Sequence, residues 1–121
     1  MRAVVCTSFD GIDALTCVDD APVPPMAEGG VRLRVHAAGI NFADTLMCKG
    51  EYQVKPPFPF SPGLEVAGEV LEVAPGVTRV KPGDRVMATV HYGGYASEAV
   101  THETTVYAIP DNLDFVSAAA F

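Results

Sequence analysis

The residues best suited to chemistry lie in two short stretches, "NFADTLMCKG" (41–50) and "SPGLEVAGEV" (61–70). The second is a turn followed by an almost continuous apolar run. One carboxylate, Glu65, stands near the start of that run, between Leu64 and Val66. Burying a charge is costly unless another group pairs with it or donates a hydrogen bond to it. Glu65 therefore needs a partner.

The first stretch predicts a short helix over 42–49, because its apolar residues follow the spacing of one helical face. Asn41 is a favourable N-cap, and Asp44 lies in the first turn, where the helix dipole stabilises an acid. Gly50 suits the position after the last turn. Asn41 and Asp44 thus have a structural explanation beside any chemical one.

The sulfhydryl and imidazole side chains are dispersed along the chain. They belong to Cys6, Cys17, Cys48, His36, His91 and His102. The cysteine spacings match no disulfide framework or zinc motif, so we expect reduced and mostly packed thiols. We expect the histidines on the surface or in strands. One alternative stays open for Cys48, because the neighbouring Lys49 can lower a thiol pKa and make the sulfur reactive.

The composition limits the classes of partner. The chain has 121 residues, of which 49% are hydrophobic, and that is enough for one domain with its own core. Its net charge is −7 and its Lys and Arg residues are scattered, so we expect neither a nucleic-acid nor an acidic membrane partner. No apolar run approaches the roughly 20 residues of a membrane span. The first residues lack the features of a signal peptide. We therefore expect a cytoplasmic protein.

Short strands separated by Gly and Pro predict a mainly β fold. Alternation in 31–40 predicts a half-buried strand with His36 on its solvent side. A strand over 65–74 contains a phase slip at Val70–Leu71, which together with Gly68 predicts a bulge or bend. Further strands are predicted at 2–7, 15–18, 85–90, 94–101 and 105–109, with proline-rich loops at 19–30 and 51–63. This pattern is typical of a closed or half-closed antiparallel barrel.

The last stretch, "PDNLDFVSAAAF" (110–121), predicts a helix that begins near Asp114. The sequence stops before this helix is long enough to bury its apolar face, and a helix of that length is marginal alone. We therefore expect the chain to be the N-terminal part of a longer protein, with its final helix cut at the chain end.

Four motifs follow one another along the chain: "VRLRVHAAGINFADTLMCKGEY", "FSPGLEVAGEV", "VKPGDRV" and "GGYASEAV". In this order they resemble the N-terminal, GroES-like domain of the medium-chain dehydrogenase/reductase superfamily. The closest resemblance is to its zinc-free, NADPH-dependent quinone oxidoreductases, the zeta-crystallin relatives.

The resemblance covers essentially all of residues 1–121. It implies a bent, partly open β-barrel with a few short helices, which forms the substrate side of an active-site cleft. The other wall would be a Rossmann domain, inserted after the helix near Asp114. No G-x-G-x-x-G follows a strand in this sequence, so we expect that partner domain outside it.

The resemblance also predicts that the site holds no metal. In zinc alcohol dehydrogenases the motif equivalent to 39–44 supplies a catalytic Cys, and the motif equivalent to 63–65 supplies a His ligand. This sequence has Asn41 and Leu64 at those positions, and it lacks the four-cysteine lobe of the structural zinc. A catalytic zinc needs three protein ligands. We therefore expect Glu65 to have a structural role, held by backbone N–H groups or by an arginine.

Three residues are candidates for ligand contact through the resemblance. Asn41 would lie beside both the nicotinamide and the substrate. Tyr52 would border the substrate pocket and donate its hydroxyl to a quinone oxygen. Asp44 is the third substrate-side candidate, although a structural role in the first helical turn is favoured. Leu46 stands where many relatives carry another tyrosine, which implies a more apolar pocket. No residue is assigned as catalytic.

The function implied is zinc-independent hydride transfer from NADPH to quinones or α,β-unsaturated carbonyls. Hydrogen-bond donors can stabilise the developing oxyanion in place of a metal. NADPH would be bound mainly by the Rossmann domain of the same full-length chain, and the full-length protein is expected to be a homodimer. Two alternatives remain. One is a non-catalytic GroES-like binding module of the co-chaperonin kind, for which the loop 51–63 is too rich in proline to look mobile. The other is a structural role of the crystallin kind.

Overall fold

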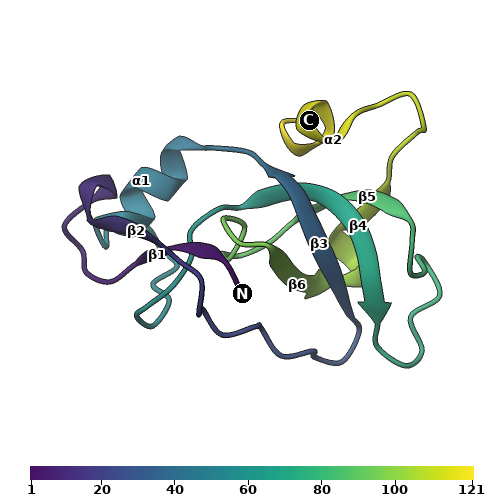
Figure 1. Ribbon diagram of the computed structural model, residues 1–121, viewed down its shortest axis with the longest axis horizontal. Coiled ribbons are helices and arrows are strands. Elements are labelled where there is room, and N and C mark those ends of the chain that lie inside the picture. Colours follow the sequence, from purple (N-terminus) through teal and green to yellow (C-terminus); the bar gives the residue numbers. More distant parts are fainter.

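The computed structural model describes all 121 residues and is mainly β (Figure 1). The strands are β1 (Ala3–Cys6), β2 (Leu15–Val18), β3 (Gly30–Ala38), β4 (Glu65–Val73), β5 (Arg85–Thr89), β6 (Glu98–His102) and β7 (Val106–Ala108). The helices are α1 (Phe42–Cys48) and α2 (Phe115–Ala119), with 3-10 turns η1 (Ile12–Ala14) and η2 (Glu103–Thr105). None of these helices has the length and apolar character needed to cross a membrane.

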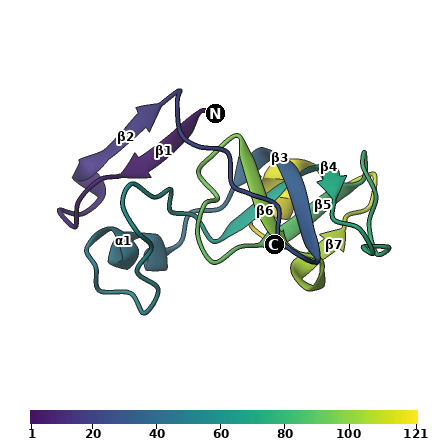
Figure 2. The ribbon, with the colours of Figure 1, turned by 90° about the horizontal axis from the view of Figure 1, so that it is seen from below.

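The strands form two antiparallel sheets. β1 and β2 make the predicted hairpin, and the other five strands are ordered β6-β3-β4-β5-β7. β6 and β7 are the two edges of the larger sheet and do not pair with each other, so no barrel closes. Figure 2 shows the hairpin and α1 together at one end of the molecule and the five-stranded sheet at the other. The predicted mainly β, partly open fold with a few short helices is confirmed.

The paired strands β3 and β4 are bent, because their pairing contains two irregularities. Leu33 pairs with Val70 while Arg32 pairs with Glu72, so Leu71 has no partner. This confirms the bulge that the phase slip predicted. A second irregularity leaves His36 unpaired on β3. Extra residues of this kind bend a strand and increase its twist, and β4 is visibly curved in Figure 1.

Gly68 lies where the bent strands approach most closely. A Cβ atom at this position would overlap the carbonyl oxygen of Arg34 on β3. Glycine is used where one backbone must pass close to another. The backbone of Gly68 does not have a positive φ. Glycine is therefore required here because there is no room for a Cβ atom.

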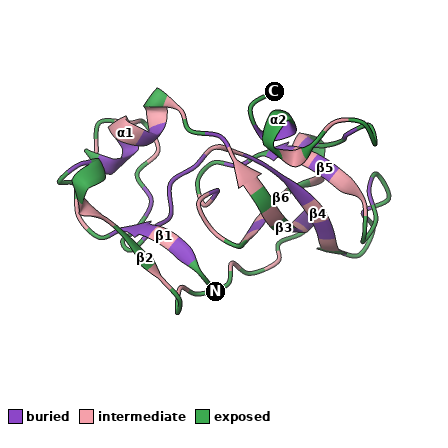
Figure 3. Cartoon of the chain, turned by 45° about the horizontal axis from the view of Figure 1, so that its top comes forward, coloured by how far each residue is buried: buried purple, intermediate pink, exposed green.

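Three apolar clusters hold the fold together. One packs α2 against the sheet through Ala67, Ile109, Ala118 and Ala119. The other two differ in size. The larger one fills the inside of the five-stranded sheet and contains Val31, Leu33, Val66, Val70, Ala74, Val77, Val80, Val86, Ala88 and Val106. A smaller one joins β1, α1 and the loop before β4 through Cys6, Met47, Cys48 and Phe60. Figure 3 shows buried residues both in the sheet and at the α1 end. The smaller cluster therefore fixes α1 against the loop that leads into β4.

The C-terminal helix α2 lies on the outside of the sheet (Figure 1). It begins where the sequence predicts, because the Asp114 carboxylate accepts a hydrogen bond from the Ser117 N–H at 2.6 Å. Phe115 stacks on His36 with a centroid distance of 4.3 Å, and Arg85 covers its ring at 4.5 Å. His36 is exposed, as predicted, but it is also part of the surface that receives α2.

The prediction for β6 is wrong at its start. The sequence predicts a strand from residue 94, whereas β6 begins at Glu98. Gly93, Gly94 and Tyr95 instead form backbone hydrogen bonds with the loop before β4. The N–H groups of Gly93 and Tyr95 donate to the carbonyls of Ser61 and Pro62 at 2.7 and 2.9 Å. Ala96 then bridges to Ala3 on β1, and the Val4 N–H donates to the Tyr95 carbonyl at 2.8 Å. Pairing with a loop and with β1 replaces pairing within the larger sheet there.

We predict that Gly68→Ala lowers the free energy of unfolding by about 2 to 4 kcal/mol, the range expected for steric overlap in a packed interior. Urea denaturation followed by circular dichroism measures the change. Gly76→Ala is the control, since Gly76 has φ of +92° but no atom within 4 Å of an added Cβ. That change should cost about 1 kcal/mol through backbone strain alone. Equal losses in the two variants would contradict the packing explanation.

Candidate functional site

The site starts from the first turn of α1. Asn41 is the N-cap, with extended backbone angles, and the helix begins at Phe42 as predicted. The Asp44 carboxylate turns back along the helix, and its Oδ2 accepts a hydrogen bond from the Asn41 N–H at 2.9 Å. An acid at this position satisfies a free backbone donor and complements the helix dipole.

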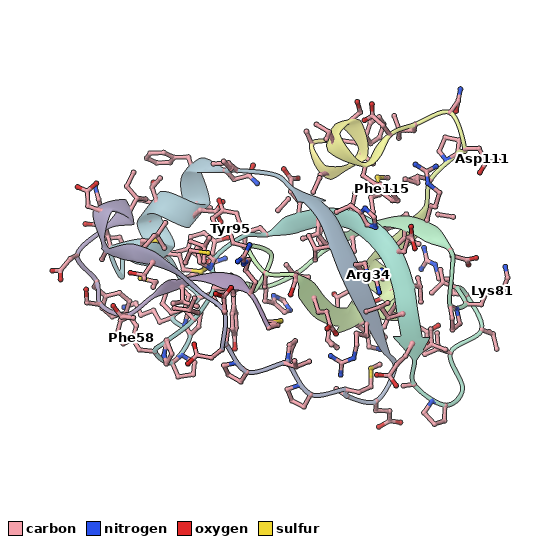
Figure 4. The ribbon with its side chains drawn as sticks, in the orientation of Figure 1. Arg34, Phe58, Lys81, Tyr95, Asp111 and Phe115 are labelled. Atoms are coloured by element: carbon pink, nitrogen blue, oxygen red, sulfur yellow. The ribbon has the colours of Figure 1, made fainter.

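Asp44 also binds two segments outside its own helix. Its Oδ2 accepts the Tyr95 hydroxyl at 2.6 Å, and its Oδ1 accepts the Gly63 N–H at 3.1 Å. The residue is only 3% exposed. Tyr95 lies between α1 and the five-stranded sheet (Figure 4). The buried carboxylate is therefore stabilised by three donors, which is the condition under which a buried charge is tolerated.

The environment also changes the acidity of Tyr95. Burial raises the pKa of its hydroxyl well above the ordinary value of 10.0, and the hydrogen bond to Asp44 raises that pKa further. The hydroxyl therefore remains a protonated donor throughout the neutral range.

Gly63 and Gly94 allow the two loops around Asp44 to meet. Gly63 has φ of +102°, and a Cβ there would lie 2.7 Å from the Tyr95 ring. The Gly94 N–H donates to the Gly63 carbonyl at 3.1 Å. Side chains at these positions would separate Tyr95 from Asp44.

A pocket of about 340 Å³ lies beside this network. It is lined by Asn41, Tyr52, Gln53, Val54, Leu64, Glu65, Thr89, Val90 and His91. The structure thus brings Asn41 and Tyr52, two of the three predicted ligand contacts, to one pocket. Asp44 is not in its lining, and its described polar contacts are with Asn41, Gly63 and Tyr95. A substrate contact of Asp44 stays a prediction.

The partner predicted for Glu65 is wrong. The sequence suggested backbone N–H groups or an arginine, whereas Glu65 Oε1 accepts a hydrogen bond from Asn41 Nδ2 at 3.2 Å. The Glu65 side chain lies over Gly39, where a Cβ would overlap the carboxylate. The partner is a side chain 24 positions away that the helix start presents, so local sequence could not identify it.

Two further residues of this region were not predicted from the sequence. His91, two residues after β5, lines the pocket. Tyr95 does not line it, but its hydroxyl binds Asp44, which in turn binds the pocket residue Asn41. The signal that was available is the Gly-Gly pair before Tyr95, which marks a close approach of backbones. Nothing in the local sequence indicates which segment that backbone approaches.

The pocket residues do not fit a tetrahedral zinc. The resemblance implies that Asn41 and Leu64 stand where zinc alcohol dehydrogenases supply Cys and His ligands, and neither side chain is a zinc ligand of that kind. No group of three or more His, Cys, Asp or Glu residues is placed to hold a metal ion. The polar side chains of the pocket are hydrogen-bonding groups: two amides, one phenol, one hydroxyl, one imidazole and one carboxylate.

A larger pocket of about 800 Å³ lies between β1, the loop 19–30 and β6. It contains none of the predicted ligand contacts. It shares Thr89, Val90 and His91 with the smaller pocket, so this segment forms a common wall. We place the candidate site in the smaller pocket because convergent polar groups, rather than volume, give a site its chemistry.

The alternative of a reactive Cys48 is wrong. Cys48 is fully buried, and burial raises the pKa of its thiol to about 11, with the neighbouring Cys6 thiol adding to the effect. A thiol reacts as its thiolate, so this sulfur is inert near neutral pH. All three cysteines are free, and Cys17 is the exposed one.

We predict that one of the three thiols reacts rapidly with Ellman's reagent in the native chain at pH 8. Cys17 should account for this fast phase, and Cys6 and Cys48 should react only after unfolding in urea, because both are buried. Cys17→Ser should abolish the fast phase and leave the urea-dependent phase unchanged. A fast phase that persists in Cys17→Ser would contradict the packing of Cys48.

We predict that Asp44→Ala lowers the free energy of unfolding by at least about 3 kcal/mol, since three donors lose their acceptor and each unsatisfied group costs about 1 to 3 kcal/mol. Chemical denaturation measures the loss. Asp19→Ala is the control, because Asp19 makes one exposed ion pair with Arg2, and exposed pairs contribute little. Similar stability of the two variants would show that water replaces the Asp44 acceptor freely.

Comparison with known proteins agrees with the fold and the motifs. The sequence profile of the alcohol dehydrogenase GroES-like domain matches residues 27–111. The quinone oxidoreductase-like protein 2 of Rattus norvegicus is 44% identical over 118 residues, which are 98% of this chain and 33% of that protein. The quinone oxidoreductase of Lama guanicoe is 41% identical over 121 residues, covering 99% of this chain and 37% of that protein.

Solved structures give the same result. The quinone oxidoreductase from Thermus thermophilus, also solved in complex with NADPH, matches with a TM-score of 0.80 and 38% identity, over all of this chain and 36% of its own. The human synaptic vesicle membrane protein VAT-1 homolog-like protein matches with a TM-score of 0.91 and 39% identity, over all of this chain and 39% of its own. This chain therefore spans about a third of the length of the curated relatives it matches. It belongs to the family of alcohol dehydrogenase GroES-like domains.

Proposed function

We propose that residues 1–121 are the substrate-side domain of an oxidoreductase that transfers hydride from NADPH to quinones or α,β-unsaturated carbonyls without zinc. The observation that carries this proposal is the pocket in which Asn41 and Tyr52 meet beside Leu64. An amide, Asn41, and an apolar side chain, Leu64, stand where the resemblance implies zinc ligands in the zinc alcohol dehydrogenases. Relatives that are named quinone oxidoreductases support the class of reaction.

The pocket fits an uncharged acceptor. Its only acidic residue is Glu65, which accepts from Asn41 and disfavours an anionic ligand close by. The Asn41 amide nitrogen has two N–H groups, and one of them is used by Glu65. The second N–H and the Tyr52 hydroxyl are donors of the kind that bind a carbonyl oxygen as it gains negative charge.

NADPH, when bound, supplies the hydride. Asn41 is the residue of this chain that we assign to both the cofactor and the substrate, and Tyr52 is assigned to the substrate. Asp44 stays a substrate-side candidate, although its polar contacts in the structure are with Asn41, Gly63 and Tyr95. We further propose that a Rossmann domain of the full-length chain binds most of the cofactor, that the full-length protein is a homodimer, and that it is cytoplasmic.

The co-chaperonin-like alternative has less support. Such a module requires a long mobile loop, and the candidate loop 51–63 is fixed near its end. Phe60 exchanges backbone hydrogen bonds with Cys6 at 2.7 and 3.1 Å, and the Gly63 N–H is held by Asp44. The chain offers no other feature that favours this function.

The test is NADPH oxidation by the full-length protein with a panel of quinones and enones. Asn41→Ala should lower kcat/KM by about tenfold or more, because the loss of one productive hydrogen bond approaches the 1.4 kcal/mol that corresponds to a factor of ten. Tyr52→Phe should lower it in the same direction. Asn112→Ala, in the exposed loop before α2, is the matched control and should retain full activity.

Metal analysis completes the test. Activity should survive chelators, and zinc should be substoichiometric. Stoichiometric zinc would overturn the metal-independent part of the proposal. The absence of turnover with every quinone and enone, while NADPH binds, would falsify the reductase function as a whole.

A further inference from the structure

The Asp44 carboxylate hydrogen-bonds to the three segments that carry the pocket residues Asn41, Leu64 and His91. We propose that Tyr95 and Asp44 are positioning residues, which fix the Asn41 amide relative to Leu64 and Glu65 without touching the ligand. As a statement about ligand binding, this inference rests on the proposed function. As a statement about the position of Asn41, it can be tested without any activity.

The three donors to Asp44 come from three separate parts of the chain. Asn41 belongs to the helix start, Gly63 to the loop before β4, and Tyr95 to the loop after β5. Each part also supplies a pocket wall: Asn41 itself, Leu64 directly after Gly63, and His91 in the loop that leads to Tyr95. One carboxylate therefore links all three walls by hydrogen bonds, in addition to the apolar packing of α1 against the loop before β4.

Tyr95 is suited to this role because its backbone is fixed. Its N–H donates to Pro62 at 2.9 Å, and its carbonyl accepts from Val4 on β1 at 2.8 Å. The ring then spans from this anchored backbone to Asp44, and the side chain makes one hydrogen bond, at 2.6 Å. Tyr95 thus links the loop before β4, through its backbone, to the first turn of α1, through its hydroxyl.

The Asn41–Glu65 contact depends on this arrangement. Asn41 moves with α1, whereas Glu65 begins β4, two residues after Gly63. The hydrogen bond between their side chains is 3.2 Å long, so a small separation of the two segments would break it. The remaining Asn41 N–H would then lose its direction. Loss of the Tyr95 hydroxyl, more than 40 positions away along the chain, is thus expected to act on Asn41.

The first experiment compares Tyr95→Phe with Tyr107→Phe in the full-length protein. Tyr95→Phe should lower kcat/KM for the quinone by about tenfold or more, chiefly through KM, since misplacement of a binding group by an ångström costs up to about a hundredfold. The Kd for NADPH, which is bound mainly elsewhere, should change less. Tyr107 is exposed on β7, so the same chemical change there should leave the kinetics unaltered.

A second experiment monitors the environment of the Asn41 side-chain amide without measuring activity. The sequence contains only two asparagines, Asn41 and Asn112, so labelling with ¹⁵N-asparagine gives two side-chain amide groups. In the 121-residue chain, Tyr95→Phe should shift the Asn41 amide signals and speed their hydrogen exchange. The Asn112 signals serve as the internal reference and should not move. Asp44→Asn keeps the shape but removes an acceptor, and should shift the same Asn41 signals.

The outcomes separate the two proposals. If Tyr95→Phe lowers the melting temperature but leaves KM and the Asn41 signals unchanged, Tyr95 is merely structural and the inference is wrong. If the Asn41 signals respond while the wild-type protein reduces no quinone or enone, the positioning role stands and the proposed function fails. A changed KM together with shifted Asn41 signals supports both.

Discussion

The fold around the candidate site depends on satisfying the hydrogen-bonding capacity of one carboxylate inside the protein. Asp44 is almost fully buried, and its oxygens accept from a helix N-terminus, a glycine N–H and a tyrosine hydroxyl. Removal of any donor leaves a desolvated charge with weaker compensation, which is costly in an interior of low dielectric. The glycines at 63 and 94 follow from this constraint, because larger residues would hold the donors apart.

The same constraint explains how a small pocket is held at the junction between the two ends of the molecule. The hairpin and α1 pack through the cluster around Met47 and Phe60, while the sheet packs through its own valine-rich core. Asp44 adds hydrogen bonds from α1 to the loops before β4 and after β5. The pocket beside it then presents the Asn41 amide, oriented by Glu65, where the resemblance to zinc alcohol dehydrogenases implies a ligand sulfur. The scaffold is thus compatible with different chemistries through exchange of a few side chains.

Many local features could be predicted from the sequence. The start of α1 follows from Asn41 and Asp44, and the irregularity in β4 follows from its broken alternation. These features depend on backbone propensity and on which faces are apolar, and both are local properties. The start of β6 could not be predicted, because residues 93–97 pair with the loop before β4 and with β1 before the chain joins the larger sheet at Glu98. Propensity describes the extended backbone but does not specify its partner.

For the site, the sequence by itself determined the kinds of chemical group present. It contains an amide at Asn41, an apolar side chain at Leu64, an acid in the first turn of α1, and a tyrosine shortly after that helix. Only the tertiary structure decided that Asn41 holds Glu65, that Tyr95 holds Asp44, and that Tyr52 shares a pocket with Asn41. The Asp44 bonds join residues 19 and 51 positions apart. Contacts at such separations form only when the whole chain has packed, since local bonding preferences do not encode them.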